Sequence, residues 1–237
     1  MRGIAGRITL SGLLALAFGA AGAASAEAQA DFLGPGAGFV SAGASGIATG
    51  ELDDWLAARG YPTFGETAVT LGLGAYRVLS GGVMLGGEFN GLIIGDEEHE
   101  GREVGLGAGS LTLGVGYVVN LSPRARVYPR LGVGVGGMGL WADRADTVDF
   151  EEVLEGETPV SDSETVLSRD GLVVDLGAGA EFLPRGRRGP LIGLRAGYLA
   201  ASFDADWDAY EHTAVGGPDA SISGPYARVT VGWAWRR

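Results

Sequence analysis

Apolar and polar residues alternate along at least seven segments of this chain, and a period of two predicts strands with one apolar face. The seven segments are residues 68–79, 83–94, 104–121, 127–141, 172–182, 191–202 and 226–235. An eighth strand is expected within residues 35–47, where the composition suits a strand although the alternation is weak. Residues 51–59 are the one short helical candidate, since Leu52, Trp55 and Leu56 share a face and Gly60 follows.

The links between these segments are alternately short and long. The short links are residues 80–82, 122–126 and 184–190, and the longer ones are residues 49–66, 95–102, 142–170 and 203–224. An antiparallel barrel that crosses a membrane has this arrangement, with short turns on one side and long loops on the other. We therefore predict an eight-stranded antiparallel up-and-down transmembrane barrel, with one short helix in the first outer loop. Two places are open to this helix, on the membrane surface or as a cap over the barrel mouth, and we favour the cap.

Charge divides between the same two sides. Of the 29 acidic residues, 19 lie in the last three longer links, whereas the short links and the C-terminus carry arginine and no acid. The whole chain has a formal charge of −12, which makes it a poor candidate for binding nucleic acid, because that affinity comes from neutralising phosphates. The charge pattern predicts a barrel with one acidic and one basic rim.

The 44 glycines lie mostly inside apolar segments, and three of them imitate a nucleotide-binding motif. Gly132, Gly134 and Gly137 satisfy G-x-G-x-x-G, but that loop must open a helix, and the acidic run that follows Trp141 is a poor helix start. Residues 131–135 also read as a strand in which leucine or valine alternates with glycine. We therefore expect Gly132, Gly134 and Gly136 to face a crowded lumen, and Leu131, Val133 and Val135 to face lipid.

Six charged residues fall on the inward face of the predicted strands. They are Glu88, Arg130, Asp175, Glu181, Arg195 and Arg228. The lumen of an eight-stranded barrel is just wide enough for side chains to fill it, and a charge removed from water is costly unless it is paired and hydrogen-bonded. The three arginines and three carboxylates are therefore predicted to form a lumen charge network that fills the space left by glycine.

The first thirty residues have the build of a secretory signal peptide. Two arginines precede a short apolar run at residues 8–20, and sites with small residues follow it. We expect cleavage after Ala26 or Ala30, between which the sequence does not choose, and a barrel domain over residues 31–237. The chain has no cysteine, which excludes disulfides and metal sites built on thiolates.

Three aspartates in the last longer link are spaced as in a calcium loop. They are Asp204, Asp206 and Asp208, but Ala209 and Val215 stand where an EF-hand requires glycine and glutamate. The EF-hand is therefore rejected. Two interpretations of these aspartates remain: a looser contact with a divalent cation at the membrane surface, or a solvated acidic loop.

The two histidines, His99 and His212, both lie in longer links beside acidic residues. Neither is at the well-ordered end of a strand with a serine two residues away, which is the arrangement expected of a lipid-modifying barrel enzyme. We therefore predict no catalytic residue, and we expect no resident metal and no cofactor.

With its signal peptide, alternating links and final strand TVGWAWRR, the chain resembles the small eight-stranded outer-membrane barrels of the OmpA and OmpX type over residues 31–237. In this family the last strand carries the signal that the barrel-assembly machinery reads, here Trp233 and Trp235, although Arg236 and Arg237 follow them. The resemblance implies insertion as a monomer into the outer membrane, with both termini in the periplasm, and contact with outer-membrane lipid and lipopolysaccharide.

These features predict a non-enzymatic outer-membrane protein with a structural or surface-interaction role, carried by its long acidic outer loops. A narrow porin-like channel would require an incompletely filled lumen. A lipid-modifying enzyme would require a constellation of reactive side chains at the outer rim. A soluble secreted barrel that binds an apolar ligand is a third alternative, because a soluble sheet shows the same alternation.

Overall fold

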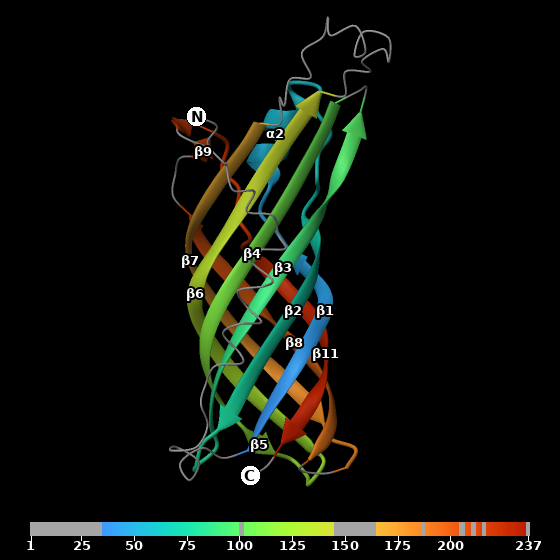
Figure 1. Cartoon of the computed structure of the whole chain (residues 1–237), viewed down its shortest axis with the longest axis vertical. Coiled ribbons are helices and arrows are strands. Elements are labelled where there is room, and N and C mark those ends of the chain that lie inside the picture. The colour runs from blue at the N-terminus through green and yellow to red at the C-terminus, as the bar shows by residue number, and fades with distance from the viewer. Residues whose placement is uncertain are drawn as a thin grey trace, which may run out of the picture. The chain divides into compact units, whose positions relative to one another are not determined.

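The computed structural model describes residues 35–99, 102–144, 165–185, 188–203, 207–209, 212–214 and 217–235. Eight long strands form the wall of a barrel (Figure 1). They are β1 (Gly36–Gly46), β2 (Thr67–Val78), β3 (Val83–His99), β4 (Arg102–Tyr117), β6 (Ala125–Arg144), β7 (Thr165–Phe182), β8 (Gly189–Phe203) and β11 (Gly224–Trp235). The smaller elements are the helix α2 (Gly50–Ala57) and the short strands β5 (Val119–Asn120), β9 (Trp207–Ala209) and β10 (His212–Ala214).

The barrel is closed because every long strand pairs with two antiparallel neighbours. β1 pairs with β2 on one side and with β11 on the other, and β6 pairs with β7, so the sheet has no open edge at mid-height. Gly36 faces Trp235 across the β1–β11 seam, so both chain ends of the barrel lie at the end that carries the short turns. We call this the short-turn end and the opposite one the long-loop end. The predicted fold class is confirmed.

Large apolar side chains cover the outside of the barrel. Leu113, Leu172, Leu176 and Leu194 each expose 63–70% of their surface, and more than twenty further large apolar residues are similarly outward. A monomeric soluble protein rarely exposes so continuous an apolar surface. Among the described residues, no helix is long and apolar enough to cross a membrane.

The strands at the long-loop end are longer than the sequence predicted. Pairing between β2 and β3 stops at Val69 and Ile93, whereas β3 and β4 remain paired as far as His99 and Arg102. The expected loop at residues 95–102 is therefore wrong, because its acidic run extends β3 instead of leaving the sheet. β6 and β7 also pair to their outer ends, so β3, β4, β6 and β7 continue as a projecting sheet beyond the level where β2 ends (Figure 1).

β1 lies within residues 35–47, where the eighth strand was expected despite weak alternation. The sizes of its inward and outward side chains explain why the alternation is weak. Ser41 and Ser45 point inward, whereas Ala42 and Ala44 point to the outside. Apart from Phe39 and Val40, the side chains on both faces are small, so hydropathy hardly changes from one position to the next. Pairing with β2 and β11 over nearly its whole length, and not amphipathic alternation, holds β1 in register.

The helix α2 lies in the link between β1 and β2 at the long-loop end (Figure 1). It spans Gly50–Ala57, close to the predicted range, and buries Leu52 and Leu56 while Trp55 stays partly exposed. The Thr49 hydroxyl ties its start to the rest of the link by donating a hydrogen bond to the Gly65 carbonyl (2.8 Å). An isolated bridge between Ala48 and Ser221 joins this link to the segment before β11.

Candidate functional site

The interior of the barrel is divided into three layers along its length. The layer at the short-turn end is a buried apolar group that we call the inner cluster: Ala37, Phe39, Tyr76, Val78, Met84, Val118, Tyr128, Leu183, Leu191 and Ala234. The middle layer holds buried charged residues, which we call the central charge cluster. At the long-loop end a second apolar group, the outer cluster, joins strand residues to α2 and to the segment before β11.

Glu88 is the centre of the charge cluster and contacts three arginines from three other strands. Its Oε2 accepts hydrogen bonds from Arg130 and from Arg195 Nη1 (2.8 Å), and its Oε1 accepts one from Arg228 Nη1 (3.1 Å). Arg130 Nη2 also lies 3.1 Å from Asp175 Oδ2. All five side chains are more than nine-tenths buried. One carboxylate therefore joins β3, β6, β8 and β11 across the lumen.

Glu181 forms a second centre toward the short-turn end. The Tyr128 hydroxyl donates to its Oε1 (2.9 Å), and the Tyr76 hydroxyl donates to its Oε2 (2.5 Å). Arg126 Nε donates to the same Oε2 (2.8 Å), and Arg195 Nη2 lies 3.7 Å from Oε1. Arg195 Nε also donates to the Tyr128 hydroxyl (2.8 Å), which links this centre to Glu88. The two centres therefore form one connected network.

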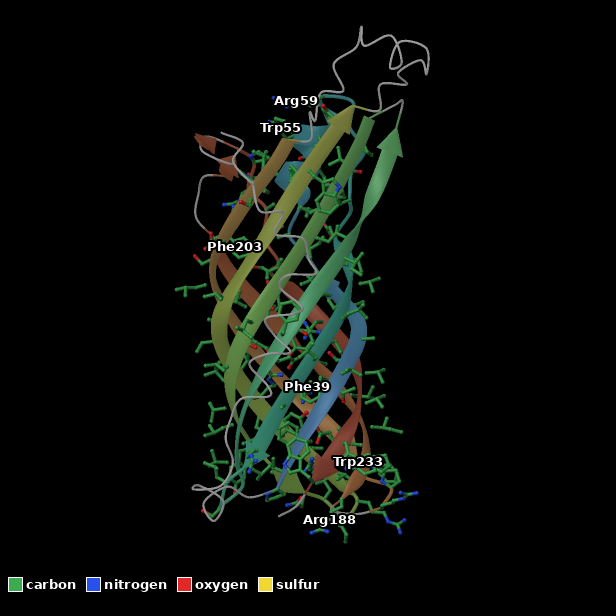
Figure 2. All side chains as sticks on the ribbon, in the orientation of Figure 1. Phe39, Trp55, Arg59, Arg188, Phe203 and Trp233 are labelled. Carbon is green, nitrogen blue, oxygen red and sulfur yellow. The ribbon has the colours of Figure 1, made fainter. Side chains whose placement is uncertain are left out.

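Aromatic rings and one amide complete the network. The Tyr226 hydroxyl donates to Asp175 Oδ1 (2.7 Å), and Arg228 stacks over the Tyr226 ring with its Cζ 4.2 Å from the ring centre. Arg228 Nη1 also donates to Asn90 Oδ1 (2.6 Å). Arg195 lies 3.8 Å over the Phe39 ring, which Figure 2 shows in the short-turn half of the barrel. Each guanidinium is thus packed against carboxylate, amide or aromatic surface.

Glycine on the inward face makes room for these rings. A Cβ placed on Gly179 would overlap the Tyr128 ring, and one on Gly177 would overlap the Tyr226 hydroxyl. The rings therefore lie directly against the backbone of β7. This accounts for glycine at positions that would otherwise carry side chains pointing into the lumen.

Replacing Gly179 with alanine is expected to destabilise the barrel by about 1–3 kcal/mol, the usual cost of overpacking a well-packed interior. The added methyl group forces the Tyr128 ring away from β7 and strains its hydrogen bonds with Glu181 and Arg195. Urea unfolding of the refolded protein measures the change. Gly50→Ala is the control, since a Cβ there meets no atom within 4 Å. An equal loss in both variants would contradict this explanation of the inward glycines.

The structure brings all six charged residues of the predicted network together, and it adds members that sequence reasoning missed. The sequence assigns Arg126 to a short link, yet it is the second residue of β6 and its side chain is only 11% exposed. Tyr76 is on the predicted inward face, but parity alone gives it no role. The described cluster therefore contains four arginines and three carboxylates, not the balanced set expected. Arg228 Nε and Nη2 are buried without a hydrogen-bond partner among the described residues.

The outer cluster closes the long-loop end with apolar side chains. Leu52 and Leu56 of α2, Trp207 of β9 and Ile222 are each at most 2% exposed. They pack with inward residues from the outer parts of the strands: Leu92, Val104, Leu106, Ala108, Met138, Leu140, Val173, Leu199 and Tyr226. The lumen is therefore apolar in its outer part, which the predicted charge network did not anticipate.

Trp207 is fixed in the outer cluster by polar contacts at its edges. Its Nε1 donates a hydrogen bond to the Pro218 carbonyl (3.0 Å), and Arg169 stacks over its ring at 5.2 Å. Arg169 Nη1 also donates to Asp219 Oδ1 (3.0 Å), and the Asp219 amide donates to Glu51 Oε2 (3.2 Å). These contacts connect β7, the segment before β11 and α2 into one cover over the barrel mouth.

The remaining candidate residues are only partly within the described chain. Asp204 and Asp206 lie outside the described residues, and Asp208 lies in β9, where it faces Thr213 of β10. His99 is at the tip of the β3–β4 hairpin and His212 begins β10. No group of three or more acidic or histidine side chains that could hold a metal occurs in the part of the chain that the structure describes.

Trp233 projects from the outer face of β11 at the short-turn end, as Figure 2 shows. Trp235 lies on the same face near the seam, where its ring covers Gly36 and Gly38 of β1. The two residues predicted as an assembly signal thus form an aromatic patch at one end of the apolar belt. Aromatic girdles at the membrane interface are a property of outer-membrane barrels.

The sequence matches the family model described as "Outer membrane protein beta-barrel domain" over residues 12–217. The chain belongs to this outer-membrane β-barrel family. The resemblance to small outer-membrane barrels is therefore confirmed, and the family places the protein in the outer membrane. Such barrels have short periplasmic turns and longer extracellular loops. A search of the curated proteins finds no match to the sequence.

The structure is similar to solved structures of outer-membrane barrels. Ail, the attachment invasion locus protein of Yersinia pestis, in complex with the heparin analogue sucrose octasulfate, is 11% identical with a TM-score of 0.50, covering 85% of this chain and 99% of Ail. Neisserial surface protein A is 9% identical with a TM-score of 0.45, covering 86% and 97%. A major outer membrane protein from Thermus thermophilus is 12% identical with a TM-score of 0.48, covering 85% and 99%. At 11% identity, the likeness to Ail shows the fold alone.

Proposed function

We propose that this protein is a non-enzymatic, non-conducting barrel that strengthens the outer membrane and contacts partners outside the cell. The observation that carries the proposal is the filled lumen. Glu88, with its three arginines, lies between an apolar layer on the periplasmic side and another at the outer mouth. A protein whose interior is packed in this way acts through its surfaces. The filled interior argues against the alternative of a narrow channel.

The acidic outer end of the barrel supports a role in binding partners outside the cell. The projecting sheet extends the wall beyond the outer cluster, and its acidic residues Asp96, Glu97 and Glu98 lie on β3. The outer part of β3 is paired with β4 on one side, while its pairing with β2 ends at Ile93. Charged residues on an exposed edge keep it from pairing with other strands indiscriminately. We propose that this acidic edge, with the acidic links around it, selects partners by charge.

The charge of the outer surface points to the chemistry of the partner. Ail was solved with sucrose octasulfate, a heparin analogue and a polyanion. A chain of charge −12 whose outer links hold most of its acids is unsuited to such a ligand. We propose instead cationic partners, or lipopolysaccharide phosphates bridged by a divalent cation. The contact of Asp204, Asp206 and Asp208 with such a cation stays part of this proposal.

The route to the membrane is proposed from the sequence. Residues 1–30 act as a cleaved signal peptide, with cleavage after Ala26 or Ala30, and Trp233 and Trp235 present the last strand to the barrel-assembly machinery. Pairing between β1 and β11 closes the barrel within one chain, which supports insertion as a monomer.

Protease treatment of intact cells tests the surface role. The acidic link between β6 and β7 should be cleaved from outside, while the membrane retains the two barrel fragments together. Cells with a permeabilised outer membrane are the control, since the periplasmic short turns become accessible only there. Cleavage that requires permeabilisation would reverse the proposed orientation. A change in the mass of lipid A on overexpression would instead support the lipid-modifying enzyme.

A further inference from the structure

Six polar atoms inside the barrel have no hydrogen-bond partner among the described residues. They are the hydroxyl oxygens of Ser41, Thr70, Ser110 and Thr230, and the Nε and Nη2 nitrogens of Arg228. Buried polar atoms in proteins are nearly always paired, so such orphans point to a water molecule or an ion that they bind. All six groups can donate a hydrogen bond. One acceptor placed among them would therefore satisfy several at once.

Arg228 reaches from β11 to β3 across the inward faces of β1 and β2. These four strands are neighbours in the order β11, β1, β2, β3 around the barrel (Figure 1). Arg228 Nη1 is fixed at β3, where it donates to Glu88 Oε1 and to Asn90 Oδ1. Thr70 of β2 lies in the same row of the sheet as Arg228, with Gly43 of β1 between them. No side chain of β1 therefore separates Arg228 from Thr70 in this row.

The neighbouring row of inward residues brings a second orphaned hydroxyl to the amide that anchors the guanidinium. The row runs from β11 to β4 through Thr230, Ser41, Gly72, Asn90 and Ser110. A Cβ placed on Gly72 would lie 2.6 Å from Ser41 Oγ and 2.5 Å from Asn90 Oδ1, so these two oxygens are close together. Ser110 and Thr230 stand at the two ends of the row. Ser41 and Thr70 are thus the orphaned hydroxyls nearest to the path of the arginine.

The charges of the cluster favour an anion over a water molecule as this acceptor. Among the described residues the cluster has four arginines and three carboxylates, so one positive charge is left over. Arg228 reaches one carboxylate, Glu88, and shares it with two other arginines. The other two carboxylates have arginine partners of their own. A buried charge without compensation is strongly destabilising, and a bound monovalent anion removes it, whereas water does not.

We propose that the lumen holds one chloride ion, bound by Nε and Nη2 of Arg228 and by the hydroxyl groups of Ser41 and Thr70. Hydrogen bonds between a guanidinium and an anion are charge-assisted and strong. Gly43 and Gly72 leave the inward faces of β1 and β2 without side chains beside Arg228, which suits a single-atom ion better than a phosphate. The inner and outer clusters lie on either side of the charge cluster, so the ion is a fixed part of the folded interior and does not permeate.

Urea unfolding of the protein in uncharged detergent micelles tests the site, with sodium chloride replaced stepwise by sodium gluconate at constant ionic strength. An ion that binds the folded chain alone stabilises it in proportion to the logarithm of its concentration once the site is filled. Each tenfold increase in chloride should then lower the unfolding equilibrium constant of the wild type about tenfold. Arg228→Met, which removes the charge in excess, should make the stability independent of chloride.

Two isosteric variants separate the site from the other buried hydroxyls. Thr70→Val should need about tenfold more chloride for the same stabilisation, because a hydrogen bond to a charged group is worth about 1.5–3 kcal/mol and about 1.4 kcal/mol is tenfold. Thr230→Val is the matched control and should respond to chloride as the wild type does. Both hydroxyls are orphaned on residues that are 0% exposed, but Thr230 Oγ1 lies toward β8, 2.5 Å from where a Cβ on Gly193 would be.

Crystals grown in sodium bromide locate the ion directly. An anomalous bromide peak within hydrogen-bond distance of Arg228 Nε and Nη2 is the expected result. The absence of a peak there would overturn the proposal, as would an equal chloride response in Thr70→Val and Thr230→Val. Stability that stays constant when gluconate replaces chloride would also overturn it, and would show that the orphaned atoms bind water alone.

Discussion

Replacing Glu88 with glutamine is expected to destabilise the folded barrel by about 3–5 kcal/mol, the cost of removing one partner from a buried ion pair. Glu88 contacts Arg130, Arg195 and Arg228 at once, so its loss leaves three buried guanidinium groups around a neutral amide. Asp175 and Glu181 remain, but each already has partners of its own. Urea unfolding of the protein refolded into detergent micelles measures the change in the free energy of unfolding.

Two control variants show whether the loss of stability comes from the buried charge of Glu88. Glu66→Gln removes an exposed carboxylate and should change stability by no more than about 0.5 kcal/mol. Arg228→Met should destabilise less than Glu88→Gln, because Glu88 keeps Arg130 and Arg195 and two nitrogens of Arg228 have no partner among the described residues. If Glu88→Gln proved as mild as Glu66→Gln, the central charge cluster would not be what holds the strands together.

Replacing Leu56 with alanine is expected to open the outer mouth while the barrel wall stays folded. Leu56 is 2% exposed within the outer cluster, and a buried leucine-to-alanine change costs about 2–5 kcal/mol. That cost is a factor of roughly 30 to several thousand in the equilibrium between closed and open cover, since about 1.4 kcal/mol is tenfold. The loss should be local, because α2 lies outside the strand pairing of the wall.

Hydrogen–deuterium exchange of the peptide that contains α2 measures this opening. Faster exchange in α2 and in the segment before β11, with unchanged protection of β4 and β6, is the expected pattern. Trp55→Ala is the matched control on the same helix, because Trp55 is partly exposed and points away from the outer cluster, near Arg59 in Figure 2. Cooperative unfolding of the whole barrel in Leu56→Ala would show that the cover is not a separate unit.

The sequence predicts the wall well because alternation reports directly which face of a strand is buried. The positions of Glu88, Asp175 and Arg195 on the inward face followed from the parity of apolar neighbours, and the structure places them there. Parity cannot tell which inward residues meet, since that depends on the stagger of strands around the barrel. The contact of Glu88 with Arg195 crosses 107 residues of sequence and has no local signal.

The outer cluster escaped prediction for a different reason. At the outer ends of β4 and β6 the inward residues Val104, Leu106, Met138 and Leu140 are apolar, while positions 105, 107, 137 and 139 on the outward face are all glycine. Hydropathy therefore no longer separates the two faces there, as in any strand buried on both sides. The helical pattern of α2 predicted a buried face and a cap over the barrel mouth, but nothing local indicated which residues of the lumen it contacts.

The central claim is that side chains fill the lumen from one end to the other. Electrical recording in planar lipid bilayers tests it most directly, with refolded protein whose mobility in SDS differs between unheated and boiled samples, as for a closed barrel. We expect no steps of conductance for the wild type at any moderate voltage, and none for Leu56→Ala, because the central charge cluster and the inner cluster remain closed when the cover opens. Regular single-channel steps from the wild-type protein would contradict a filled lumen and establish the protein as a narrow channel.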